Sequence, residues 1–279
     1  MATARTLPST TWPGERLQTF SGHTKSINAV AVSRDGRQIL TGSTDHTAIL
    51  WDTATGKRLR TFGPHKSNVS VVAFGPSGQR VLTLGSYEAV IVWDAATGKR
   101  LREMKARGDA AALSPDGRYV LTAADDNAAV VWDVSSGRAR HTLRGHVEDV
   151  SSAAFSPDGM LIATGSRGGN VIVWNAASGS RLFVLRGHAG VVQSLAFSPG
   201  GRMLASGGQG GSTRLWEVSA GQELARLATF EYDAKDWLAI TPDGLFDGSA
   251  GARQKVTFRI GGGLRVVPVD RWQHRTACV

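Results

Sequence analysis

The chain has 279 residues, of which 41% are hydrophobic and 20% are charged, a composition typical of a globular protein with one or two domains. The N-terminal MATARTLPSTTW lacks the apolar core of a signal peptide, and no apolar run approaches the roughly 20 residues of a membrane-spanning helix. The single cysteine, Cys278, excludes an intramolecular disulfide and a zinc site built of cysteines. We therefore expect a cytoplasmic protein without a membrane partner.

The net charge of +9 could indicate a nucleic-acid partner. The basic residues, however, recur a few positions after each of several tryptophans, as in GKRLR and GKRLRE. Lysine and arginine in such places protect an edge strand from pairing with other sheets. They are not interleaved with aromatic residues, which a base-stacking surface needs. We interpret them as a solvated edge and do not expect nucleic acid as a partner.

Two stretches near the N-terminus, TGSTDHTAILWD (41–52) and TLGSYEAVIVWD (83–94), begin a repeat that continues along the chain. Its tryptophans are Trp51, Trp93, Trp132, Trp174 and Trp216, with spacings of 42, 39, 42 and 42 residues. A turn motif of the type SPDG precedes each of them, and Gly-His pairs recur in the same register. A period of about 40 residues indicates an array of stacked units.

One period, residues 146–188, shows what each unit is. It contains four short apolar runs, VSSAAF, LIATG, VIVW and RLFVL, separated by turn residues. SPDG suits a type I turn, and the runs suit strands. The third run is apolar at every position, so we expect both of its faces to be buried between like sheets. Four-stranded antiparallel sheets stacked around an axis form a β-propeller.

The Gly-His start, the Trp-Asp end and the period make residues 17–227 resemble the WD40 repeat family. The resemblance implies an all-β WD40 propeller with five clear blades of four antiparallel strands. Thr241-Pro242-Asp243-Gly244 and Phe258 continue the spacing, so we expect a divergent sixth blade with strands near 236–241, 245–249, 255–260 and 264–269. The propeller would span 14–269 between tails at 1–13 and 270–279, with blades at about 17–58, 59–100, 101–139, 140–181, 182–223 and 224–269.

Closure of the ring has two alternatives. In the family, the N-terminal segment commonly supplies the outer strand of the last blade, and GERLQTF (14–20) matches the other outer strands. It would then displace 264–269, whose Pro268 makes it the poorer pairing strand. Otherwise, the chain is part of a longer array. We expect a monomer if the ring closes.

The family resemblance also implies a structural role for the histidines, which would join a buried hydrogen-bond set with a Ser or Thr, an Asp and the tryptophan. The first repeat carries all four members, and the others carry incomplete sets. The expected members are His23, Thr41, Asp45, Trp51, His65, Thr83, Trp93, Thr122, Asp126, Trp132, His146, Thr164, Trp174, His188, Ser206 and Trp216.

Function is expected to be non-enzymatic: a scaffold that binds other proteins or peptides. The expected inner strands are small and apolar, so we expect no catalytic, cofactor or metal site; a propeller enzyme is the weakest alternative. The family resemblance implies that partners dock where the histidine loops and the turns between second and third strands gather. Carried over by motif position, the candidate partner-binding residues are Asn28, Tyr87, Arg107, Asp109, Asp125, Asp149, Arg167 and Gln193. DWLAITPDGLFDGSAGA (236–252) resembles propeller ends of bacterial proteins that carry a caspase-like peptidase domain. A module truncated from such a larger signalling or peptidase protein is therefore the second alternative.

Overall fold

The computed structural model describes residues 18–75, 77–86, 89–105, 108, 110–124, 126–209, 211–230, 236–242, 246–248, 257–259 and 266–268. Within these residues every regular element is a β-strand. The described residues include no helix of the length and apolarity that a membrane crossing requires.

Five antiparallel sheets, which we call blades 1 to 5, follow one another along the chain. Blade 1 contains β1 (Ile27–Val32), β2 (Gln38–Ser43), β3 (Ala48–Asp52) and β4 (Arg58–Phe62). Blade 2 contains β5 (Val69–Phe74), β6 (Arg80–Gly85), β7 (Val90–Asp94) and β8 (Arg100–Met104). Blade 3 contains β9 (Ala111–Leu113), β10 (Tyr119–Ala123), β11 (Ala129–Asp133) and β12 (Ala139–Leu143). Blade 4 contains β13 (Val150–Phe155), β14 (Leu161–Ser166), β15 (Val171–Asn175) and β16 (Arg181–Leu185). Blade 5 contains β17 (Val192–Phe197), β18 (Met203–Gly208), β19 (Ser212–Glu217), β20 (Gln222–Phe230), β21 (Asp236–Ile240) and β22 (Phe246–Gly248).

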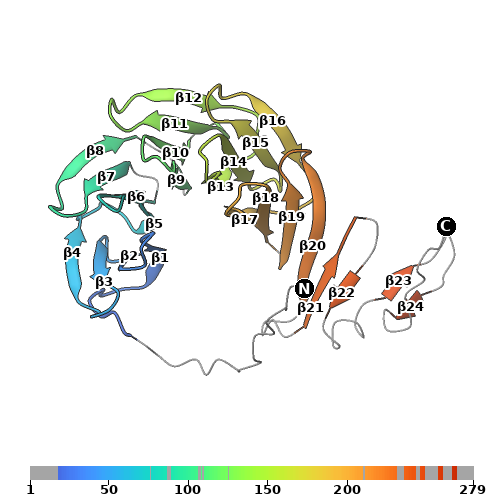
Figure 1. Cartoon of the computed structure of the whole chain (residues 1–279), viewed down its shortest axis with the longest axis horizontal. Helices are drawn as coiled ribbons and strands as arrows, with labels where there is room; N and C mark the ends of the chain where they lie inside the picture. The colour runs from blue at the N-terminus through green and yellow to red at the C-terminus, as the bar shows by residue number, and fades with distance from the viewer. Residues whose placement is uncertain are drawn as a thin grey trace, which may run out of the picture.

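The blades stand side by side in an arc, with the first strand of each blade on the inside and the fourth on the outside (Figure 1). Apolar clusters fill the spaces between neighbouring blades: Leu40 and Leu50 of blade 1, for example, pack with Val72 and Trp93 of blade 2. The third strands are buried on both faces, as at Ile49 and Leu50, each 2% exposed. This explains why these strands read as continuous apolar runs. The all-β fold with five propeller-type blades is confirmed.

Turn chemistry explains why the repeat motifs recur. Where SPDG-type motifs join the first two strands, the glycine N–H donates to the serine carbonyl, as from Gly36 to Ser33 at 2.9 Å. These glycines have φ near +70°, a conformation that side chains rarely adopt. The aspartate of Trp-Asp closes the turn to the fourth strand, because Asp52 Oδ1 accepts from Thr55 N at 2.8 Å and from Thr55 Oγ1 at 2.6 Å.

The C-terminal strands correct the expectation of a sixth four-stranded blade. Strands do occur near the expected positions, but β21 pairs with β20 and β22 pairs with β21, so both extend blade 5. β23 (Thr257–Arg259) and β24 (Val266–Pro268) pair with each other in a separate two-stranded sheet. β20 is paired on one side with β19, which leaves its other edge free for the next strand in the chain, β21. Consecutive strands tend to pair in this way. In Figure 1 these strands extend away from the arc.

The N-terminal segment is described only from Gln18 onward. Residues 18–20 form no strand, yet the Phe20 ring lies 5.8 Å from the Trp51 ring, just as the Phe62 ring at the end of β4 lies 5.7 Å from Trp93. Residues 18–20 thus occupy, against blade 1, the place that an outer strand occupies against the next blade. The remainder of the expected closing strand and the two expected tails lie outside the described residues.

Candidate functional site

One face of the arc is formed by two sets of loops: those that enter each first strand and those that join each second strand to the third. A backbone hydrogen bond connects the two loops of a blade. Thr44 N donates to Ser26 O, Ser86 N to Asn68 O, and Arg167 N to Asp149 O, each at 2.9 Å. We call this surface the loop face. Its loops are held to one another and are not independent.

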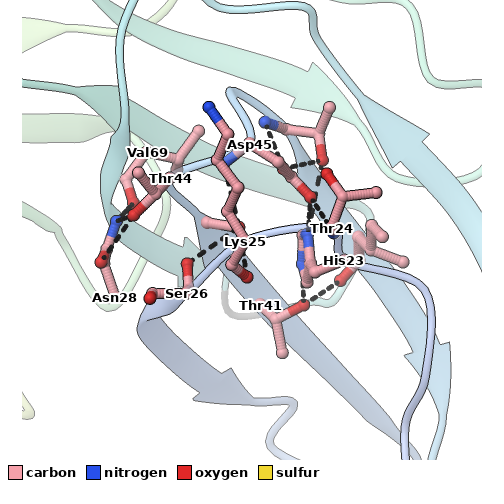
Figure 2. A network of polar contacts seen from close by, with 12 residues as sticks. His23, Thr24, Lys25, Ser26, Asn28, Thr41, Thr44, Asp45 and Val69 are labelled. Atoms are coloured by element: carbon pink, nitrogen blue, oxygen red, sulfur yellow. Dashed lines mark hydrogen bonds and ion pairs between the residues drawn. The ribbon is translucent and has the colours of Figure 1, made fainter.

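Blade 1 contains a buried hydrogen-bond set of His23, Thr41, Asp45 and Trp51, of which Figure 2 shows the first three. His23 Nε2 lies 2.7 Å from Thr41 Oγ1, and His23 Nδ1 lies 2.8 Å from Asp45 Oδ2. Trp51 Nε1 donates to Thr41 Oγ1 at 2.8 Å. The set therefore connects the loop before β1 with β2, with the turn after β2, and with the core tryptophan on β3.

Asp45 accepts more hydrogen bonds than the histidine alone provides. Thr24 N donates to its Oδ2 at 3.0 Å, and Thr47 Oγ1 donates to its Oδ1 at 2.6 Å. Burial of the carboxyl opposes ionisation, but the hydrogen bonds from Thr47, Thr24 and His23 outweigh it and hold the pKa of Asp45 well below its usual range. The carboxylate is thus a fixed, charged connector within the loop face.

Blades 2, 4 and 5 have incomplete sets. In each, the tryptophan donates to the Thr or Ser of the second strand: Trp93 to Thr83 at 2.7 Å, Trp174 to Thr164 at 2.8 Å, and Trp216 to Ser206 at 2.8 Å. His146 and His188 each place Nε2 2.7 Å from that hydroxyl. His65 is different, since neither ring nitrogen has a hydrogen-bond partner among the residues that the structure describes.

Burial keeps the histidines of these three blades neutral. Burial lowers the pKa of His65 to about 4, with a further contribution from Arg100 and His46. Burial also lowers the pKa of His146 to about 4 and lowers that of His188. Unlike His23, none of these three rings is hydrogen-bonded to a carboxylate among the described residues.

Blade 3 keeps only the tryptophan bond of the set, from Trp132 Nε1 to Thr122 Oγ1 at 2.9 Å. Asp126, which we expected in this set, lies apart from it. Its side chain is 77% exposed, against 9% for Asp45, and it forms an exposed ion pair with Arg144, with Asp126 Oδ2 3.9 Å from Arg144 Nη1. Blade 3 has no histidine that could donate a hydrogen bond to this carboxylate, and burying a carboxylate without such a donor is unfavourable.

The expected partner-binding residues are only partly described. Asn28 Nδ2 donates to Thr44 Oγ1 at 3.1 Å and to Val69 O at 3.3 Å, which joins blade 1 to blade 2. Asp149 and Arg167 form an exposed pair across the two loops of blade 4, with Oδ2 3.8 Å from Nε. Gln193 is exposed on β17. Tyr87, Arg107, Asp109 and Asp125 lie outside the described residues.

Sequence reasoning missed a buried ion pair in blade 5. Arg214, only 5% exposed, stands on the third strand where the other blades have Ile or Val, and its guanidinium contacts the Glu223 carboxylate and donates to Gly187 O. This holds the Gly-His loop of blade 5 in place. The signal was the charge within STRLWE, an otherwise apolar strand position.

The geometry defines a repeat β-propeller whose loops are fixed by buried polar sets. Comparison with protein families matches the WD domain, G-beta repeat, at residues 14–52, 56–94, 104–133, 137–175 and 179–217. These matches cover most of the chain, which therefore belongs to the WD40 repeat family.

Individual relatives match over a short part of the chain. The chain is 50% identical over 42 residues to eukaryotic translation initiation factor 3 subunit I of Xenopus tropicalis. It is 48% identical over 42 residues to the same subunit of Danio rerio. Each match covers 15% of this chain and only 13% of the relative.

Proposed function

We propose that this protein is a non-enzymatic scaffold that binds other proteins or peptides through its loop face. The observation that carries the proposal is the mutual fixation of the loops by backbone bonds and by the His23–Asp45–Thr41 set. A surface that is ordered before binding loses little conformational entropy when a partner docks. WD40 domains generally mediate protein–protein interactions, which agrees with this reading.

The exposed polar residues on this face would supply specificity. Asp149 and Arg167 are exposed and lie across from each other on blade 4, and the exposed residues Asn28 and Gln193 present amides on blades 1 and 5. Exposed charges of this kind affect mainly the association rate and partner choice. We place the scaffold in the cytoplasm.

The test is cross-linking and pull-down with the full chain, comparing two charge reversals. Asp149→Lys together with Arg167→Glu changes the loop face, whereas Arg34→Glu together with Arg37→Glu changes the opposite face at the turn between β1 and β2. We expect the first double variant to lose the captured partners and the second to keep them. Equal capture by both variants would contradict the loop-face proposal.

A second candidate is that the chain is the propeller module of a larger bacterial signalling or caspase-like peptidase protein. Residues 236–252 carry the sequence resemblance, and β21 and β22 extend blade 5 away from the arc. Mapping the transcript that encodes the chain tests this candidate. An in-frame peptidase domain would support it, and a stop codon after residue 279 together with a start codon at residue 1 would contradict it.

A further inference from the structure

The Gly-His segment covers the core tryptophan in blades 1 and 4. A methyl group added to Gly22 would lie 2.9 Å from Trp51 Cη2 and 3.8 Å from Ile49 Cδ1. One added to Gly145 would lie 3.3 Å from Trp174 Cη2 and 3.5 Å from Ile172 Cδ1. The histidine that follows packs edge-on against the same tryptophan, with ring centroids 6.2 Å apart in blade 1 and 6.5 Å apart in blade 4. The Gly-His segment therefore shields the tryptophan and the Ile two residues before it on the third strand from solvent.

Blade 3 lacks this segment. The spacing from Trp93 to Trp132 is three residues shorter than the others, and the stretch KARGDAA that enters the blade contains no histidine. The pairing of Thr122 with Val130, like that of Thr41 with Ile49, identifies Val130 and Trp132 as the residues that Gly-His would cover. Trp132 is partly exposed, whereas the other four repeat tryptophans are between 1% and 5% exposed. The most exposed of the five repeat tryptophans is thus in the blade whose sequence lacks the Gly-His pair.

A cavity of about 340 Å³ lies at this place, and both Trp132 and Val130 line it. The small side chains of Ala128 and Thr142 also line the cavity. Its volume falls within the range of cavities that hold ligands. The space is large enough for one or two side chains of a partner, and the indole offers a flat surface for an aromatic or aliphatic group.

Two cations stand at the rim of this cavity. Lys105 follows the end of β8, Arg144 follows the end of β12, and both are exposed. Arg144 forms an exposed, long ion pair with Asp126, with Nη1 3.9 Å from Oδ2. Lys105 forms no ion pair with a carboxylate of the described residues. An apolar floor with a basic rim favours a ligand that carries a hydrophobic group beside a carboxylate.

We propose that the cavity over Trp132 is a binding pocket for an acidic peptide segment of a partner protein. The peptide inserts an aromatic or aliphatic side chain against Trp132 and Val130, in the place that Gly-His occupies in blades 1 and 4. Its flanking carboxylates bind between Lys105 and Arg144. This inference rests on the proposed scaffold function and specifies one site and one partner chemistry for it.

The test is a fluorescence-anisotropy titration of the full chain with a labelled peptide in which one phenylalanine is flanked on both sides by glutamates. A second peptide with lysines in place of the glutamates measures the contribution of charge. We expect the acidic peptide to bind, the basic one not to bind, and the affinity to fall as salt rises from about 0.05 to about 0.3 M. Lys105→Glu together with Arg144→Glu should weaken binding at least about tenfold, which is about 1.4 kcal/mol.

Matched variants separate the pocket from general charge effects. Arg186 occupies in blade 4 the position that Arg144 occupies in blade 3, but the site beside it is filled by Gly145-His146. Arg186→Glu should therefore change the affinity by less than about twofold. Thr142→Trp, which fills the cavity, should abolish binding, and Thr61→Trp at the same position of blade 1 should not. The five substituted positions are all exposed, so thermal melts should confirm folding of each variant: Lys105, Arg144, Arg186, Thr142 and Thr61.

The outcomes distinguish this inference from the scaffold function. If the acidic peptide fails to bind, or binds the filled and charge-reversed variants as tightly as the parent, the pocket proposal is wrong. If, in that case, the parent chain still captures partners that the Asp149→Lys, Arg167→Glu variant loses, the scaffold function stands without the pocket. If neither peptide nor partner binds, both proposals fail.

Discussion

His65 shows what a buried histidine without an acidic partner does to stability. Its side chain lies against Trp93 with the ring centroids 5.9 Å apart, and the residue is 6% exposed. Burial, with Arg100 and His46 nearby, lowers its pKa from 6.5 to about 4. In the unfolded chain the imidazole takes up a proton at higher pH than in the folded chain. The free energy of unfolding therefore has its full value above the unfolded pKa of 6.5, and it decreases as the pH falls from there toward 4.

We expect His65 to contribute about 2 kcal/mol of stability at about pH 7 that is lost by about pH 5. The measurement is urea unfolding of the parent and of His65→Gln at both pH values. The variant should lose less stability on acidification, whatever its stability at neutral pH. An unchanged pH dependence would mean that His65 finds a partner that stabilises its charged form.

Asp45 and Asp126 occupy equivalent positions in blades 1 and 3 but differ in burial and bonding. Asp45→Ala removes the acceptor for Thr24 N, Thr47 Oγ1 and His23 Nδ1, and should destabilise the protein by about 2–4 kcal/mol. Among the described residues, Asp126→Ala removes only a long, exposed contact with Arg144, and it should change stability by less than about 0.5 kcal/mol. Thermal or urea unfolding of the two variants decides the matter. Similar losses would show that Asp126 takes a buried place in solution.

At the scale of elements, neighbouring blades are joined by one recurring contact. The third residue of a fourth strand (β4, β8, β12 or β16) packs its side chain against the glycine in the turn before the fourth strand of the next blade. Arg60 Nη1 donates to Thr97 O beside Gly98 at 3.3 Å, and Arg102 Nη2 donates to Ser135 O near Gly137 at 2.8 Å. Blade 4 uses Phe183 in the same place, against Gly221. The contact joins residues more than 30 positions apart, so the blades stack in a fixed register.

Gly221 and Gly36 allow this contact to be separated from backbone strain. Both glycines have positive φ, +65° and +70°, but a methyl group on Gly221 would lie 2.7 Å from Phe183 Cδ1, whereas one on Gly36 would meet nothing within 4 Å. Gly36→Ala should cost about 1 kcal/mol for the left-handed backbone alone. Gly221→Ala should cost about 2–4 kcal/mol, because the rigid ring cannot move aside cheaply. Equal costs in urea unfolding would mean that Phe183 does not pack on Gly221.

The repeat made most of the fold predictable from sequence. Trp51 and its equivalents predict the buried third strand, and the SPDG glycines predict the turn, because both depend on local geometry. The pairing of β21 with β20 was not predictable, since it depends on which strand edge is free. Likewise, the motif predicted the members of the hydrogen-bond set, but it could not show that Asp126 turns to solvent once the loop before blade 3 is shortened. Long-range contacts such as Phe183 with Gly221 leave no local signal.

At the scale of the whole molecule, the described blades form an arc whose first blade has an uncovered face. Val30 on β1 and Val72 on β5 pair with Thr41 and Thr83 at equivalent positions. Val72 is 7% exposed because blade 1 covers it, whereas Val30 is 61% exposed. Val32, two residues further along the same face, is 59% exposed. Among the described residues, only the short segment at 18–20 lies where a preceding blade would stand.

The different exposure of Val30 and Val72 allows a test of whether the ring is open in solution. Val72→Ala removes buried methyl groups from the interface of blades 1 and 2 and should cost about 1.5–3 kcal/mol in urea unfolding. Val30→Ala should cost less than about 0.5 kcal/mol if its face remains in water, because no packing is lost. A cost for Val30→Ala that approaches the cost for Val72→Ala would mean that another sheet covers β1. Light scattering on the same samples then identifies the source of that sheet: a monomer would indicate that the chain closes its own ring, and a dimer that a second copy supplies the cover.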